Sequence, residues 1–152
     1  MPGRFYELWF AARYLHVASI AVLAGGATLA AIVFALGADA DMERGLAVGL
    51  AYERIFWIVV GLTALTGVSN LGLKGEGLLD ASTQWGAALT FKLSAVLAFL
   101  TLSIVRTQIA LDLAHEHAAR RARIMLASFY GVSAAAMLTI AWVGLGLAHG
   151  RY

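Results

Sequence analysis

Four long apolar segments constrain the fold more than any other feature of this 152-residue sequence. They cover residues 8–36, 55–73, 85–106 and 124–148, and each is close to or above the ~20 residues that a helix needs to cross a bilayer. The segments are continuous, without the alternation typical of strands. Because only helices and closed barrels span lipid, the sequence predicts an all-α integral membrane protein, a four-helix bundle with up-down-up-down topology.

The composition agrees with a membrane protein whose main partner is the lipid bilayer. Hydrophobic residues make up 61% of the chain and charged residues only 13%, which excludes an ordinary soluble domain. The net charge of +2 comes from arginines clustered in the connections, so we attribute it to topology and expect no nucleic-acid partner. The absence of cysteine excludes disulfides, thiolate-ligated metals and thioether-attached haem. We expect one transmembrane domain over residues 1–152.

The basic residues predict how the chain is oriented. In an up-down-up-down bundle the first and third connections lie on one side of the membrane. The second connection and both chain termini lie on the other side. The first side holds Arg44, Arg54, Arg106, Arg120, Arg121 and Arg123, and the second holds Arg4, Arg13, Lys74 and Arg151. The positive-inside rule then places the first and third connections in the cytoplasm and both termini on the extracytoplasmic side.

A lysine inside the third apolar segment is the main functional clue. Lys92 follows Trp85 by seven residues, and His16 follows Trp9 by the same spacing in the first segment. If both tryptophans mark one membrane interface, His16 and Lys92 each lie about 10 Å below it. A charged group at such depth usually faces the bundle interior and a partner. We therefore expect these two side chains to meet.

Other polar residues of the spans are expected to converge on the same outer half of the bundle. Asn70 comes from the second segment, and His149 from the end of the fourth. Trp142 and Gly146 share a helix face with His149, and Arg13 would lie near the mouth of the cavity. The predicted cofactor-binding residues are His16, Lys92, His149, Asn70, Arg13 and Trp142.

These residues are compatible with haem. An imidazole among small residues suits an axial position on haem iron, so His16 and His149 are the candidate metal ligands. Lys92 could be a second ligand as a neutral amine, or could pair with a propionate as a cation. A purely structural interpretation stays open, in which His16 donates to a carbonyl of a neighbouring helix and Lys92 extends towards the interface.

The histidines and charged residues near the connections give weaker indications of function. His115 and His117 are two residues apart, so a helix would place them on different sides, and we expect a solvated loop or helix extension there. Asp112 with Arg106, or Glu53 with Arg54, are expected to pair locally at the inner interface, where such pairs contribute little stability.

A family resemblance runs along nearly the whole chain. The residues that carry it are His16, Gly25, Gly26, Arg54, Trp57, Thr66, Gly67, Gly86, Lys92 and Arg106. This pattern resembles the copper-resistance D (CopD) domain. It is similar, more distantly, to HemJ-type membrane proteins, whose first-helix histidine and third-helix lysine are matched by His16 and Lys92. The first resemblance implies copper passage across the inner membrane, and the second implies haem b binding with a redox role in porphyrin oxidation.

Together these features predict a multi-pass protein of the bacterial inner membrane that binds haem b in its outer half. His16 would be the axial ligand, with Lys92 or His149 as second ligand or propionate partner. Electrons would pass between a quinol or a partner subunit and an extracytoplasmic acceptor, as in a membrane oxidoreductase or a subunit of one. Copper transport is one alternative, in which His16 and outer methionines or histidines form a transient site. A non-catalytic accessory subunit of a homo- or hetero-oligomeric complex is the other.

Overall fold

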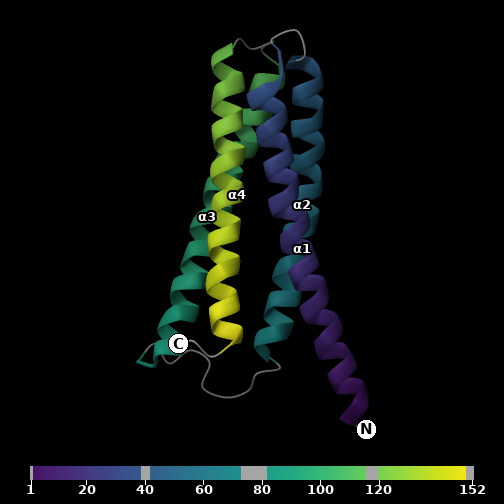
Figure 1. The fold of residues 1–152 in the computed structure, drawn as a ribbon, viewed down its shortest axis with the longest axis vertical. Coiled ribbons are helices and arrows are strands. Elements are labelled where there is room, and N and C mark those ends of the chain that lie inside the picture. The colour runs from purple at the N-terminus through teal and green to yellow at the C-terminus, as the bar shows by residue number, and fades with distance from the viewer. Residues whose placement is uncertain (1, 39–41, 73–81, 116–119, 150–152) are drawn as a thin grey trace.

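The computed structural model describes residues 2–38, 42–72, 82–115 and 120–149, and within them the chain forms four long helices (Figure 1). The helices are α1 (Pro2–Leu36), α2 (Met42–Gly72), α3 (Gln84–His115) and α4 (Arg120–Ala148). They alternate in direction, so that α1 begins and α4 ends at the same end of the bundle. Each is long and apolar enough to cross a membrane. The predicted all-α four-helix bundle is therefore confirmed.

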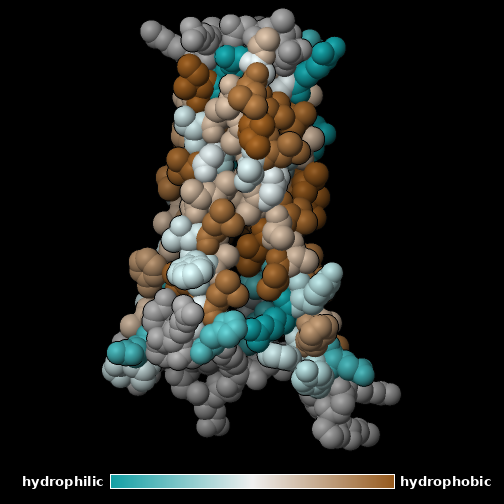
Figure 2. All heavy atoms as spheres, viewed as in Figure 1, coloured by the Kyte–Doolittle hydropathy of each residue, from teal (hydrophilic) through white to brown (hydrophobic). Residues whose placement is uncertain are grey.

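The four helices do not pack equally. Helix α1 packs extensively against both α2 and α4, whereas α3 packs mainly on α4 and only slightly on α2. In the most apolar window of α3 only 11% of the residues are buried, compared with 28% to 33% in the other three helices. On the face drawn in Figure 2, apolar side chains cover the middle of the bundle and polar ones gather towards its ends. This distribution is what a bilayer requires of the surface it surrounds.

Two helices extend well beyond the spans expected from hydropathy. Helix α2 begins at Met42 rather than at residue 55, because Gly45, Gly49 and Tyr52 are buried at helical spacing within the expected loop. Helix α3 continues past residue 106 to His115, with Ala110 buried in the bundle. Helices α1 and α4 begin six and four residues before the expected positions, and residue 73 lies outside the described residues.

Local hydrogen bonds define two of the helix ends. The Thr83 hydroxyl accepts a hydrogen bond from the Gly86 amide at 3.0 Å, as a helix N-cap does at the start of α3. After the last turn of α1, the Gly37 amide donates to the Val33 carbonyl at 3.0 Å. A Cβ at residue 37 would lie 2.7 Å from that same oxygen. Glycine is therefore the residue that allows α1 to end with this bond.

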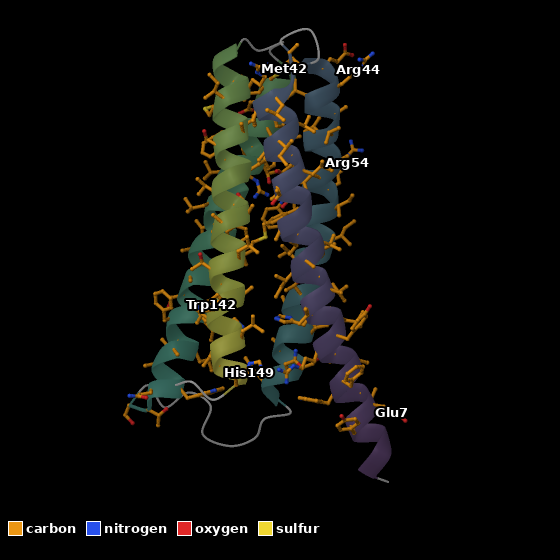
Figure 3. The ribbon with its side chains drawn as sticks, viewed as in Figure 1. Glu7, Met42, Arg44, Arg54, Trp142 and His149 are labelled. Atoms are coloured by element: carbon orange, nitrogen blue, oxygen red, sulfur yellow. The ribbon has the colours of Figure 1, made fainter. Side chains whose placement is uncertain are left out.

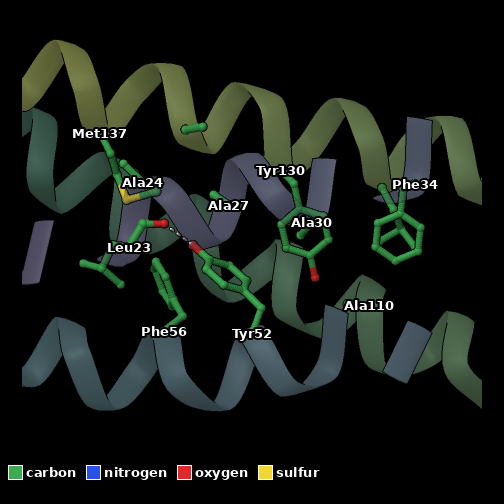
Figure 4. Packing of buried hydrophobic residues seen from close by; sticks show 12 residues of the cluster. Leu23, Ala24, Ala27, Ala30, Phe34, Tyr52, Phe56, Ala110, Tyr130 and Met137 are labelled. Atoms are coloured by element: carbon green, nitrogen blue, oxygen red, sulfur yellow. Dashed lines mark hydrogen bonds between the residues drawn. The ribbon is translucent and has the colours of Figure 1, made fainter. Parts of the chain in front are cut away.

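The core combines small residues of α1 with aromatic rings of α2 and α4 (Figure 4). Its buried members are Leu23, Ala24, Ala27, Ala30, Phe34, Tyr52, Phe56, Ala110, Leu126, Tyr130, Ala134 and Met137. The Tyr130 ring stacks on Phe34 with centroids 5.7 Å apart and meets the edge of Tyr52 at 5.5 Å. The Tyr52 hydroxyl donates to the Leu23 carbonyl at 3.1 Å. Small residues on α1 leave the space that these rings fill.

We predict that Gly26→Ala destabilises the protein by about 1–3 kcal/mol, because overpacking a filled site typically costs that much. A Cβ at Gly26 would lie 2.7 Å from the Tyr52 ring, which is held by its bond to α1. Gly25→Ala is the matched control, since nothing lies within 4 Å of a Cβ there. Unfolding by sodium dodecyl sulfate, followed by circular dichroism, should separate the two variants. Equal stability would contradict the close approach of α1 and α2.

Candidate functional site

The His16 imidazole is anchored to α2 through one ring nitrogen. Its Nδ1 lies 3.0 Å from the Thr63 carbonyl oxygen and 3.1 Å from the Thr66 hydroxyl oxygen. The Thr66 hydroxyl directs its own proton to the Leu62 carbonyl at 2.8 Å. Both neighbours of Nδ1 therefore act as acceptors, and Nδ1 must carry a proton. In the neutral imidazole this assignment leaves the lone pair on Nε2.

The second ring nitrogen of His16 is free to bind a ligand. Within the described part of the chain, Nε2 has no hydrogen-bond partner. A histidine that ligates a metal commonly has this arrangement, with one N–H donated to a backbone carbonyl and the other nitrogen directed to the metal. The Thr63 carbonyl therefore fixes both the tautomer and the orientation of His16.

A single face of α2 lines this imidazole. Thr63, Thr66, Gly67 and Asn70 follow one another at helical spacing on that face. A Cβ at Gly67 would lie 3.3 Å from Cε1 of His16, so the missing side chain lets the ring lie close to the helix. One turn further on, the Asn70 Oδ1 is buried without a hydrogen-bond partner among the described residues. A buried acceptor left unpaired is uncommon and costly, which makes Asn70 a candidate contact for a bound group.

Lys92 enters the same level of the bundle from α3. It is half-buried and close enough to His16 for the two side chains to interact electrostatically. A Cβ at Gly144 would lie 2.9 Å from the Lys92 Nζ, so the lysine occupies space that a glycine on α4 leaves. No carboxylate pairs with Lys92 in the ranges that the structure describes. We call His16, Thr63, Thr66 and Lys92 the histidine layer.

The other predicted site residues are placed less favourably. Arg13 is half-buried and lies over the Trp9 ring, 5.2 Å from its centroid. His149 is exposed, and its Nδ1 lies 2.8 Å from the Leu145 carbonyl of its own helix. Trp142 is 65% exposed and projects outward from α4 (Figure 3). Trp142 therefore does not line the predicted cavity, because its position on α4 turns the indole away from the bundle.

A metal site built from side chains alone is not found in the described residues. No three His, Asp or Glu side chains there come together in a way that could hold an ion. His115 is the last residue of α3, in agreement with a helix extension, and His117 lies outside the described residues.

A second polar layer, which the sequence analysis did not predict, lies further along the bundle. The Arg106 guanidinium donates to both carboxylate oxygens of Glu53, through Nε at 2.9 Å and through a terminal nitrogen at 3.1 Å. Only 2% of the Arg106 side chain and 4% of the Glu53 side chain are exposed. A two-pronged pair of this kind is both directional and strong. It connects α2 with α3, the two neighbouring helices that otherwise pack least.

Further groups complete the coordination of this pair. The other terminal nitrogen of Arg106 donates to the Ser133 hydroxyl at 2.8 Å, which adds α4 to the network. The guanidinium also lies over the Phe56 ring, 4.4 Å from its centroid. The Thr107 hydroxyl lies 2.5 Å from Glu53 Oε2, to which it donates. We call Glu53, Arg106, Thr107 and Ser133 the ion-pair layer.

This layer corrects the expected local pairs of Glu53 with Arg54 and of Arg106 with Asp112. Glu53 and Arg106 instead pair with each other across two helices, inside the bundle. The reason is that α2 and α3 extend beyond their apolar segments, so residues expected at an interface lie within helices. The helical spacing of the buried side chains in α3 could have predicted that Arg106 points into the bundle. Arg106 lies three residues after Ser103 and four before Ala110, both buried.

The two layers are well separated along the bundle. Glu53 and Thr66 are thirteen residues apart on α2, which corresponds to about 20 Å. Each nitrogen of the Arg106 guanidinium has a partner in the ion-pair layer. Among the described residues, by contrast, the histidine layer has an open nitrogen and a lysine without a carboxylate, and the neighbouring Asn70 has an unpaired amide oxygen. The histidine layer is therefore the candidate ligand site. Comparisons with protein-family models, with curated proteins and with solved structures find no match for the chain.

Proposed function

We propose that this protein binds haem b in its histidine layer, with His16 Nε2 as an axial ligand, and takes part in electron transfer. One observation carries the proposal: the Nδ1–H of His16 is fixed to the Thr63 carbonyl while Nε2 has no partner in the described chain. Haem proteins use such an imidazole as an axial ligand to iron. The resemblance to HemJ-type proteins, whose first-helix histidine is matched by His16, agrees with this choice.

Lys92 is the preferred second residue of the site. It lies near His16, whereas the Nδ1 of His149 contacts its own helix. An amine without a carboxylate partner would be balanced by a haem propionate, or could ligate the iron when neutral. The unpaired Asn70 oxygen, one turn from Thr66, would accept a hydrogen bond from a protonated propionate.

The position of the site suits exchange of electrons at one membrane surface. Lys92 lies eight residues from the start of α3 and Thr66 six residues from the end of α2, which places the layer about 10 Å inside the bundle. Bound haem would supply one-electron redox chemistry. The residues of the chain would hold and orient it and limit its contact with water, while a quinol or a partner subunit would be the electron donor.

We further propose a bacterial inner-membrane location with both termini outside the cytoplasm. Arg54 and Arg106 lie within helices, so the orientation now depends mainly on the arginines around the start of α4, at positions 120, 121 and 123. A cluster of this kind is retained on the cytoplasmic side. The histidine layer, at the opposite end of the helices, would then lie in the outer half of the membrane.

An absorbance spectrum tests the haem proposal. Protein purified from cells supplied with a haem precursor should show a Soret band, and reduction with dithionite should produce a sharp α-band. A colourless protein would overturn the proposal. A colourless protein that retains copper through purification would favour the copper-transport alternative, and one that retains neither would favour an accessory role.

A further inference from the structure

The outer face of α3 carries polar side chains within a membrane-spanning segment. Ser94, Thr101 and Gln108 are exposed and follow one another every seven residues, with Asp112 one turn further on. Their direction is opposite to that of Arg106, which points into the bundle. Helix α3 is also the least buried of the four helices. Polar groups in a span are usually directed to a protein partner rather than to lipid.

Two charged residues lie beside the contact between α2 and α3 on this face. Arg54 lies one turn before Trp57, whose indole donates to Thr107 of α3, and Asp112 lies one turn after Gln108. Arg54 of α2 is exposed and points away from the bundle (Figure 3), and Asp112 of α3 is exposed as well. Neither has an ion pair or hydrogen bond within the ranges that the structure covers, and Gln108 has none there either. An arginine facing lipid costs at least ~2.5 kcal/mol at the centre of a span, so a partner for Arg54 would be strongly favourable.

The levels of these charges suit a pair between two copies of the chain. Glu53, next to Arg54, bonds to Arg106, so Arg54 lies near the level of Arg106. Asp112 is six residues beyond Arg106, or about 9 Å along α3, in the direction of the nearer membrane edge. An arginine side chain extends towards that edge when it can. The guanidinium can therefore approach the level of a carboxylate on a neighbouring copy.

We propose that the outer face of α2 and α3 binds a second copy of this chain around a two-fold axis normal to the membrane. Such an axis brings each Arg54 to the partner subunit's Asp112 and places Gln108 opposite the partner subunit's Gln108. A two-fold interface needs a self-complementary surface, and this face holds both the cation and the carboxylate. The proposal does not depend on haem binding.

Cross-linking in lipid vesicles tests the proposal. The chain has no cysteine, so Gln108→Cys introduces a single thiol. Thr28→Cys is the matched control, because Thr28 is an exposed hydroxyl residue on α1, the helix diagonal to α3. It lies eight residues from its helix end, and Gln108 lies seven from its own, at the same end of the bundle. Mild oxidation should give a disulfide-linked dimer with Gln108→Cys and little with Thr28→Cys.

Charge reversal identifies the contact. Arg54→Asp and Asp112→Arg, each in the Gln108→Cys background, should weaken dimerisation about tenfold, which corresponds to ~1.4 kcal/mol. The double reversal should restore it, because the pair is re-formed with opposite signs. Equal cross-linking at Gln108 and Thr28, or a wild-type chain that is monomeric in vesicles by single-molecule photobleaching, would overturn the proposal. A dimer unaffected by either reversal would also overturn the assigned pair.

Discussion

Replacing Arg106 with methionine is expected to lower the free energy of unfolding by about 3–5 kcal/mol, the cost typical of removing one partner of a buried ion pair. Arg106 supplies two of the hydrogen bonds to the Glu53 carboxylate and also bonds to Ser133. In the variant, the carboxylate of Glu53 stays inside the bundle without its cation. It must then be protonated or be hydrated at the expense of packing.

Replacing both Glu53 and Arg106 distinguishes the effect of an unpaired buried charge from the effect of lost packing. Glu53→Leu alone should be as destabilising as Arg106→Met, because it leaves a guanidinium buried without a carboxylate. The double variant should be more stable than either single variant, since apolar replacements of a buried pair are often nearly neutral. Unfolding by sodium dodecyl sulfate measures all three, and the double-mutant cycle gives the coupling energy. Additive losses would show that the two side chains act independently.

A pair of threonine variants separates the loss of the bond to Glu53 from the loss of a hydroxyl alone. The Thr107 and Thr139 hydroxyls both lie within hydrogen-bond distance of the carbonyl four residues earlier in their helices. Only Thr107 also lies beside a carboxylate, and its single proton is donated to Glu53, the stronger acceptor. Thr107→Val is therefore expected to cost about 1.5–3 kcal/mol, the usual value for a hydrogen bond to a charged group, and Thr139→Val close to nothing. Similar losses in the two variants would contradict the role given to Thr107.

The sequence was sufficient to predict the four helices, because their apolar character is a property of each segment by itself. Their ends were predicted less well where polar residues are buried. Hydropathy stops at Arg106, yet α3 continues nine residues further because its next turns are still covered by neighbouring helices. Burial of Glu53 depends on Arg106, more than fifty residues away. No local window contains such information.

For the candidate site, too, some features could be predicted from the sequence and others could not. Equal depth of His16 and Lys92 could be read from their spacing to two tryptophans, and the structure brings both into one layer. The Thr63 carbonyl that fixes the tautomer of His16 could not be predicted, because a backbone acceptor has no sequence signature. Trp142 was assigned by shared helix face, but which face of α4 points inward depends on the packing of α1 and α3.

His16→Gly is expected to abolish the haem spectrum of the purified protein. The variant removes the only imidazole of the histidine layer, so the loss of haem affinity should exceed the roughly 10–100-fold that loss of an outer hydrogen-bond partner typically causes. The Soret band should return when imidazole is added, because the free base can occupy the space of the missing ring. His149→Gly, which removes an exposed imidazole near the end of α4, should keep the spectrum.

Lys92→Met then assigns the second residue of the site. If the amine ligates the iron, the variant should change the visible bands through the spin state of the iron while haem stays bound. If the lysine pairs with a propionate, the bands should be unchanged and haem should dissociate more readily. A haem spectrum that survives His16→Gly without imidazole would contradict the ligand assignment. His16 would then have only a structural role, joining α1 to α2 through its Nδ1–H.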